Sequence, residues 1–219
     1  MEITIDGNPD SAEARFSLHT GEMFLAESGA MTRMSPSITI QPRLLGGFLK
    51  SLIRKFFGGE SLVMGQYTAQ QDGDVVVANT TPGSIVHRKL QGEKLVITAG
   101  ALLACSEGID IRTRTHGFRQ IFSGKGAFVL ECSGSGDLVL ASFGSIIEKK
   151  IDGQLTVDTG HVVAWDPTLD YKIRGMGSIK STLLSGEGLV MDFTGSGTIW
   201  LQTRHLQGFT HWLIPFCRG

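Results

Sequence analysis

Three glycine-centred segments with the same order of residue types recur along the chain, and this recurrence constrains the fold most. Each segment is an apolar run, then glycine among small or polar residues, then a second apolar run. The three segments lie at 60–78, 126–141 and 188–202. Their central glycines are Gly73, Gly136 and Gly197, spaced by 136 − 73 = 63 and 197 − 136 = 61 residues. A nearly constant spacing is typical of proteins built from repeated structural units.

We interpret each of these segments as a β-hairpin. Glycine adopts the left-handed backbone of tight turns without a Cβ clash. Apolar runs on both sides of such a turn, as at 189–191 and 198–201, favour two paired strands. The segments at 60–78, 126–141 and 188–202 are therefore predicted to contain two strands each.

A longer echo joins residues 83–98 to residues 144–159. Gly83 and Gly144 are 144 − 83 = 61 apart, as are Gly92 and Gly153 (153 − 92 = 61). A shorter echo joins three glycine-led apolar runs that end at Ala26, Ala104 and Ala164. We therefore expect one compact all-β domain of three diverged repeats, at about 1–82, 83–143 and 144–219, related by a pseudo-threefold operation.

Composition supports a chain of many short strands. Glycine contributes 29 of 219 residues and proline only 6, whereas glycine averages about 7% in globular proteins. The net charge of −1 argues against a basic surface for nucleic acid. Three cysteines are an odd number without a CxxC pair, which argues against a disulfide framework or a structural zinc site. With no signal-peptide pattern or membrane-spanning run in the sequence, we expect a cytoplasmic protein.

One stretch, at about 44–59, has helical periodicity and no counterpart of that length in the other repeats. Its apolar residues recur one turn apart, cations occupy the other face, and two glycines follow. Two interpretations are open: the helix caps a β-sandwich or packs on a subunit, or its apolar face meets a partner or a membrane surface. The candidate contacts for the second case are Phe48, Lys50, Leu52, Arg54, Lys55, Phe56 and Phe57.

The sequence contains no arrangement of residues that supports a named reaction. No HxH, HxxxH or HExxH pattern occurs among the six histidines, so no metal site is predicted. Ser135 and Ser196 lie between glycines, but strand-like runs flank them on both sides, unlike a nucleophile elbow. We expect no catalytic residues and no cofactor, and hence a protein that is not an enzyme.

The stretch from Phe209 to Gly219 is rich in aromatic and aliphatic side chains. If exposed, such a stretch would form an association surface, and if folded back it would belong to the core. We expect it to pack within an oligomer.

With the repeat in place, the chain resembles a bacterial family of uncharacterised proteins related to the mitochondrial "altered inheritance of mitochondria" biogenesis proteins. The residues that carry the resemblance are the segments 23–31 and 58–61 and the glycine-serine-glycine segments. The resemblance implies triplicated β-sandwich or double-stranded β-helix units, similar to the tryptophan RNA-binding attenuation protein, with one short helix in an insertion. It also implies a homotrimer, and it implies no established catalytic residues.

Two functions from different classes follow as hypotheses. The first is a non-enzymatic oligomeric β scaffold that binds a protein partner or a membrane surface. The alternative is a small-ligand-binding or regulatory module with its sites at the repeat junctions. No nucleic-acid partner is expected.

Overall fold

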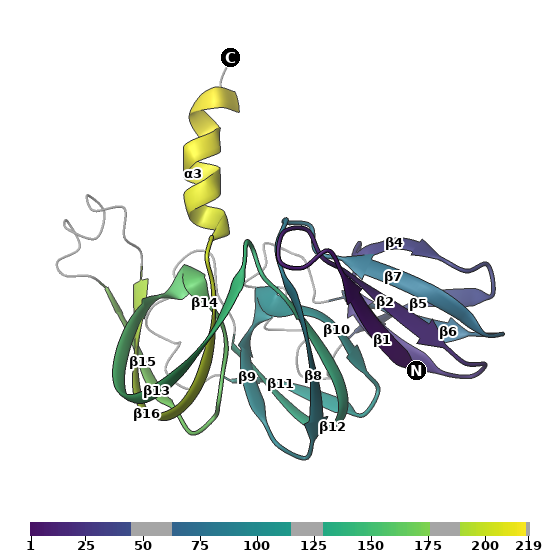
Figure 1. Ribbon diagram of the computed structural model, residues 1–219, viewed down its shortest axis with the longest axis horizontal. Coiled ribbons are helices and arrows are strands. Elements are labelled where there is room, and N and C mark those ends of the chain that lie inside the picture. The colour runs from purple at the N-terminus through teal and green to yellow at the C-terminus, as the bar shows by residue number, and fades with distance from the viewer. Residues whose placement is uncertain (45–62, 115–128, 176–188, 218–219) are drawn as a thin grey trace.

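The fold was obtained as a computed structural model, which describes residues 1–44, 63–114, 129–175 and 189–217 (Figure 1). Strands dominate this part of the chain, and its one α-helix is α3 (Leu206–Cys217). The all-β prediction is confirmed. The predicted helix at 44–59 lies almost wholly outside the described residues; Leu44 itself ends a strand.

The strands follow one another along the chain in three groups. In the first third they are β1 (Glu2–Asp6), β2 (Glu13–Leu18), β3 (Met23–Glu27), β4 (Met31–Met34), β5 (Ile38–Leu44), β6 (Val63–Ala69) and β7 (Gly73–Ala78). In the middle they are β8 (Ile85–Gln91), β9 (Leu95–Thr98), β10 (Leu102–Ser106), β11 (Ile109–Arg114) and β12 (Val129–Ala141). In the last third they are β13 (Ile146–Asp158), β14 (Val162–Trp165), β15 (Asp170–Gly175) and β16 (Leu189–Gln202).

The three predicted hairpins are wrong. β12 and β16 are single continuous strands of 13 and 14 residues that include the glycines. β6 and β7 are separate strands, but they pair with different neighbours, β6 with β3 and β5, and β7 with β2 and β4. The glycines bend the strand instead of reversing it, as Gly134 (φ +107°) and Gly195 (φ +118°) do.

β12 changes partners along its length, whereas β16 exchanges β15 for β14 on one edge and keeps β13 on the other. The first half of β12 pairs with β9 and β11, and its second half pairs with β8 and β10. A Cβ at Gly136 would lie 2.2 Å from Ser106 Oγ, so a side chain there would displace the hydroxyl that accepts from the Asp137 amide.

The same pairing pattern recurs three times. β12 with its partners β8, β9, β10 and β11 corresponds to β16 with the two halves of β13, β14 and β15. In the first third, β6 and β7 together take the place of the long strand, with partners β2, β3, β4 and β5. The division into three repeats with the boundaries given above stays a prediction, but the pairings provide a clear correspondence between strands.

A register shift marks one strand in each set. The shift falls between Met31 and Arg33 in β4, between Leu102 and Ala104 in β10, and between Val162 and Ala164 in β14. β10 and β14 pair with the second halves of β12 and β16, and β4 pairs with β7, which takes the place of such a second half. The strands β4, β10 and β14 are therefore equivalent.

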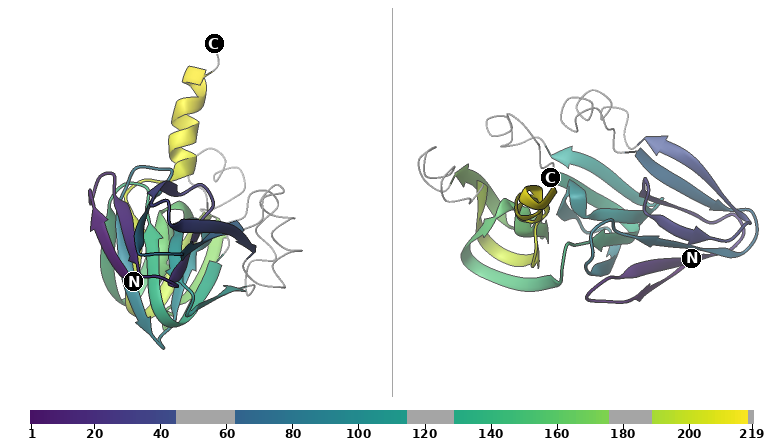
Figure 2. Two further views of the ribbon diagram at one scale, coloured as in Figure 1. Left: turned by 90° about the vertical axis from the view of Figure 1, so that its right-hand side faces the viewer. Right: turned by 90° about the horizontal axis from the view of Figure 1, so that it is seen from above.

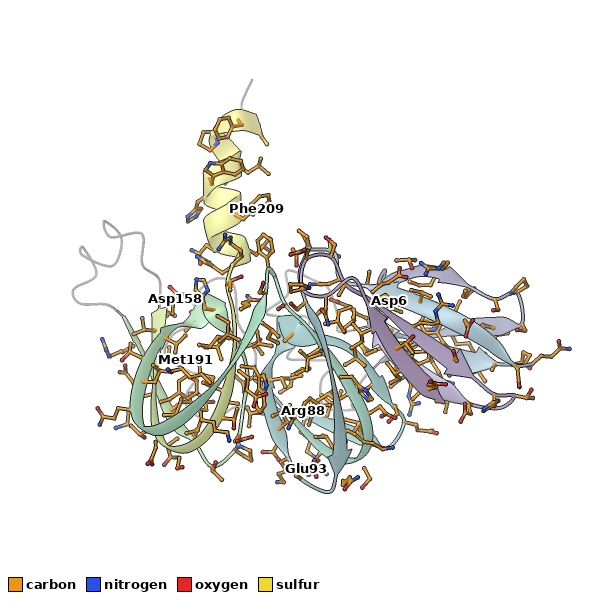
Figure 3. All side chains as sticks on the ribbon, in the orientation of Figure 1. Asp6, Arg88, Glu93, Asp158, Met191 and Phe209 are labelled. Carbon is orange, nitrogen blue, oxygen red and sulfur yellow. The ribbon has the colours of Figure 1, made fainter. Side chains whose placement is uncertain are left out.

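Neighbouring sets are joined by strand pairing and shared cores. β10 pairs with β3 of the preceding set, and β14 pairs with β9 in the same way. The core around Phe16 and Phe24 also takes in Leu103 and Val139 from the middle of the chain. At the next junction the guanidinium of Arg88, which is labelled in Figure 3, lies 4.9 Å from the centroid of the Trp200 ring. The sets lie side by side, with β4 and β13 towards opposite ends (Figure 1).

Candidate functional site

The feature that stands apart from the rest of the fold is α3, which projects from the strands into solvent (Figures 1 and 2). None of its residues is buried. Its large apolar side chains are between 36% and 72% exposed, and these are Leu206, Phe209, Trp212, Leu213, Ile214 and Phe216. Exposed apolar surface of this extent on a folded protein commonly marks a site of interaction.

Four apolar residues of α3 form a stripe with a defined spacing. Leu206, Phe209, Leu213 and Phe216 are separated by three, four and three residues. That spacing puts them on one side of a helix and is the a/d pattern of helices that pack against helices. Gln207 and His211 lie on the other side. No residue of α3 is charged, whereas helices that lie in a membrane interface commonly carry Lys or Arg on the polar face.

The base of α3 is fixed to the last strands. The Gln202 side chain accepts from the Phe143 amide at 2.8 Å and donates to the Gly160 carbonyl at 2.7 Å. The Arg204 amide donates to the Phe143 carbonyl at 3.1 Å. The Phe209 ring meets the Phe143 ring edge-on, with centroids 5.6 Å apart (Figure 3). These contacts set the direction in which α3 leaves the body.

Two histidines complete this base. The Gly208 amide donates to His205 Nδ1 at 3.2 Å, so His205 caps one of the free amides in the first turn of α3. The His205 and His161 rings are 4.8 Å apart, and His161 Nδ1 lies 2.7 Å from the Gln202 carbonyl oxygen. Sequence reasoning missed this set because its members come from β13–β14, β16 and the start of α3, and no motif spacing joins them.

The sequence-predicted partner contacts cannot be placed. Phe48, Lys50, Leu52, Arg54, Lys55, Phe56 and Phe57 all lie outside the described residues. The aromatic stretch predicted as an association surface is described as far as Cys217, and it forms α3, which begins three residues before Phe209.

Two of the described histidines form ordinary structural pairs with aspartates. His19 meets Asp72 at 3.1 Å and His87 meets Asp137 at 2.8 Å. Burial raises the pKa of the Cys105 and Cys132 thiols to about 12, which keeps both protonated. Across the described ranges no three metal-binding side chains converge on one point. In the same ranges, no helix has the length and apolar character needed to span a bilayer.

Comparison with known proteins places this fold in a family. The family described as Mitochondrial biogenesis AIM24 matches residues 3–204. An uncharacterised protein of Streptococcus pyogenes serotype M6 is 30% identical over 218 residues, covering 95% of this chain and 88% of that protein. The crystal structure of a Streptococcus pyogenes protein superposes with a TM-score of 0.82 at 31% identity, covering 98% of this chain and 99% of that one. This chain therefore belongs to the mitochondrial biogenesis AIM24 family.

Proposed function

We propose that this chain is a non-enzymatic β scaffold that self-associates as a homotrimer, with α3 as a contact between copies. The observation that carries the proposal is the uncharged apolar stripe of α3, held away from the protein's own core. A helix of 12 residues is marginal alone in water, so its stability depends on packing against something.

The occupant that fits this stripe is α3 of another copy. Its 3-4-3 spacing suits packing between helices. Its aromatic rings also contact one another along the helix: the Trp212 ring centroid lies 5.9 Å from that of Phe209 and 5.3 Å from that of Phe216. A membrane surface is the competing occupant, and the missing cations on the polar face favour the helical one. The unpaired cysteines suit a reducing compartment, so we place the scaffold in the cytoplasm.

The test compares two pairs of substitutions on opposite sides of α3. Leu213→Ser with Phe216→Ser removes the outer half of the stripe without touching the Phe143 contact. Gln207→Ser with His211→Ser places the same number of serines on the polar side of α3 and serves as the matched control. Sedimentation equilibrium at micromolar concentration is expected to give about 71 kDa (3 × 23.6 kDa) for the parent and for the control. The stripe variant is expected to dissociate at least about tenfold more readily.

Two results would overturn the proposal. One is a parent protein that sediments at 23.6 kDa. The other is a stripe variant that keeps the parent's mass but no longer co-sediments with lipid vesicles, which would make α3 a membrane contact.

A further inference from the structure

The junction between neighbouring strand sets occurs twice within the chain with the same geometry. At the first junction Ala104 of β10 pairs with Ala26 of β3, and Cys105 pairs with Leu25. At the second junction Ala164 of β14 pairs with Ile97 of β9, and Trp165 pairs with Val96. In both cases the first paired residue follows the register shift of the bulged strand.

Both halves of a third such junction are present in the chain, but they lie apart. β4 is the bulged strand of the first set, and in the described part of the chain it pairs only with β7. The strand equivalent to β3 and β9 in the last set is the end of β13, residues 155–158. Within the described residues β13 pairs only with β16. Each of these strands therefore has a free edge, and exposed edges are templates for pairing with another chain.

The equivalence of residues 155–158 with β9 rests on the turn that follows. Thr98 precedes the 3₁₀ turn Ala99–Ala101, and Asp158 precedes the turn Thr159–His161. Ile97 precedes Thr98, and Val157 precedes Asp158, so Ile97 and Val157 occupy matching positions. They are 157 − 97 = 60 residues apart. The bulged strands have the same spacing, since Ala164 and Ala104 are also 60 apart.

The first set follows the same rule. Ala104 and Arg33, each the first paired residue after its register shift, are 104 − 33 = 71 apart. Ala26 and Ile97 occupy the matching position in β3 and β9, since each pairs with the first residue after a register shift. They are also 97 − 26 = 71 apart. The register of a third junction follows directly, with Arg33 opposite Val157 and Met34 opposite Thr156.

The strands that pair at the two junctions are more deeply buried than the equivalent strands with free edges. β10 and β14 are buried along almost their whole length, whereas all four residues of β4 are exposed. Met31 and Met34 are 36% and 37% exposed. At the other edge Leu155 and Val157 are half-buried, while the equivalent Leu95 and Ile97 are buried. Pairing the two edges would remove apolar surface from water on both sides.

We propose that β4 of one copy pairs antiparallel with residues 155–158 of a second copy, so that copies join head to tail through the junction used twice inside each chain. The two edges lie towards opposite ends of the molecule, so one chain cannot join them to each other (Figure 1). The inference rests on the self-association proposed above and names its β contact. A head-to-tail contact closes into a ring when the rotation permits, and every α3 then lies on the same face of that ring.

Disulfide trapping at the deduced register tests this contact. In a Cys217→Ser background, Met34→Cys and Thr156→Cys are combined in one full-length chain, and each is also made alone. The two other cysteines are buried and do not compete. Mild oxidation is expected to link the double variant into dimers and trimers that dithiothreitol reverses, and to leave each single variant unlinked. The matched control, Ile40→Cys with Thr156→Cys, uses an exposed residue on β5. Among the described strands β5 pairs only with β6 of its own set, so this control is expected to remain unlinked.

Two results would overturn the head-to-tail contact. One is a double variant that stays unlinked although the parent protein is oligomeric. The other is efficient linking by Met34→Cys alone, which would mean that two copies of β4 meet symmetrically.

Repeating the trapping with Leu213→Ser and Phe216→Ser separates this contact from the role of α3. Linking that persists, together with an unchanged mass for the stripe variant, would support the strand contact and overturn the α3 contact. A stripe variant that dissociates, in a protein whose double-cysteine variant never links, would support α3 and overturn the strand contact.

Discussion

Cys105 and Cys132 belong to one buried core cluster, whereas Cys217 is exposed on α3. Burial raises the pKa of both core thiols to about 12, so at pH 8 nearly all of each thiol is protonated and unreactive. We predict that Ellman's reagent modifies one thiol per native chain quickly and the other two only when the chain unfolds. The Cys217→Ser variant should then show no fast thiol, and two or more fast thiols in native protein would contradict the burial described here.

Glycine shows where reasoning from single residues succeeds and where it fails. Of the three central glycines of the repeated segments, Gly136 has a positive φ, whereas Gly73 and Gly197 do not. The neighbouring Gly195 also has a positive φ. The expected chain reversal is absent, because a positive φ also suits a bend within a strand whose partners change there. Local sequence does not distinguish a turn from such a bend, since the difference lies in which distant strands offer hydrogen bonds.

At the scale of elements, the two similar stretches 83–98 and 144–159 meet at their first residues. Gly83 and Gly144, which begin the two stretches, form a parallel bridge with each other. The Ala12 amide also donates to the Gly83 carbonyl at 2.9 Å. The similarity of the runs that end at Ala26 and Ala104 was misleading, because these two residues pair with each other across a junction and do not occupy equivalent strands.

The bridge at Gly83 supports a prediction for that position. A Cβ on Gly83 would lie 2.0 Å from the Ser142 carbonyl oxygen and 2.7 Å from that of Gly144. Because both contacts are with backbone, Gly83→Ala must move a strand connection, and we expect it to destabilise the fold by about 1–3 kcal/mol. Gly100→Ala is the control, since no atom lies within 4 Å of its Cβ position. Urea denaturation of both variants measures the difference, and equal midpoints would contradict the close approach at Gly83.

The helical part of the fold was predicted only in part. The sequence analysis allowed the aromatic stretch to be exposed, and it is exposed, but its helical state was not predicted. The only helix expected from periodicity was at 44–59. Pro215 and the aromatic residues lower the apparent helix propensity of residues 206–217. The base formed by Phe143, Gln202 and His205 could not be predicted, because it depends on the long-range pairing of β13 with β16.

At the scale of the whole molecule, the three hydrophobic clusters depend on one another. The first includes Val139 from β12, and the second includes Leu25 from β3 and Trp200 from β16. The third takes in Val96 and Val129 from the middle of the chain. Alternation and glycine spacing predicted strands and their recurrence, but not this sharing, because composition says nothing about which apolar face meets which.

Shared cores imply that the described strands unfold together, and this can be tested at a distance. Phe16 is fully buried in the first cluster, while Trp165 is fully buried in the third. Phe16→Ala is expected to cost about 3–5 kcal/mol. With Trp212→Phe as background, the midpoint reported by the fluorescence of the remaining tryptophans, Trp165 and Trp200, should fall together with the midpoint from far-ultraviolet circular dichroism. Phe193→Ala, which removes a ring 5.4 Å from the Trp165 ring, is the local comparison at the same protein concentration. If Phe16→Ala produced an early step in circular dichroism while the tryptophan midpoint stayed in place, the first set of strands would be an independent folding unit, and the shared clusters would not couple the sets.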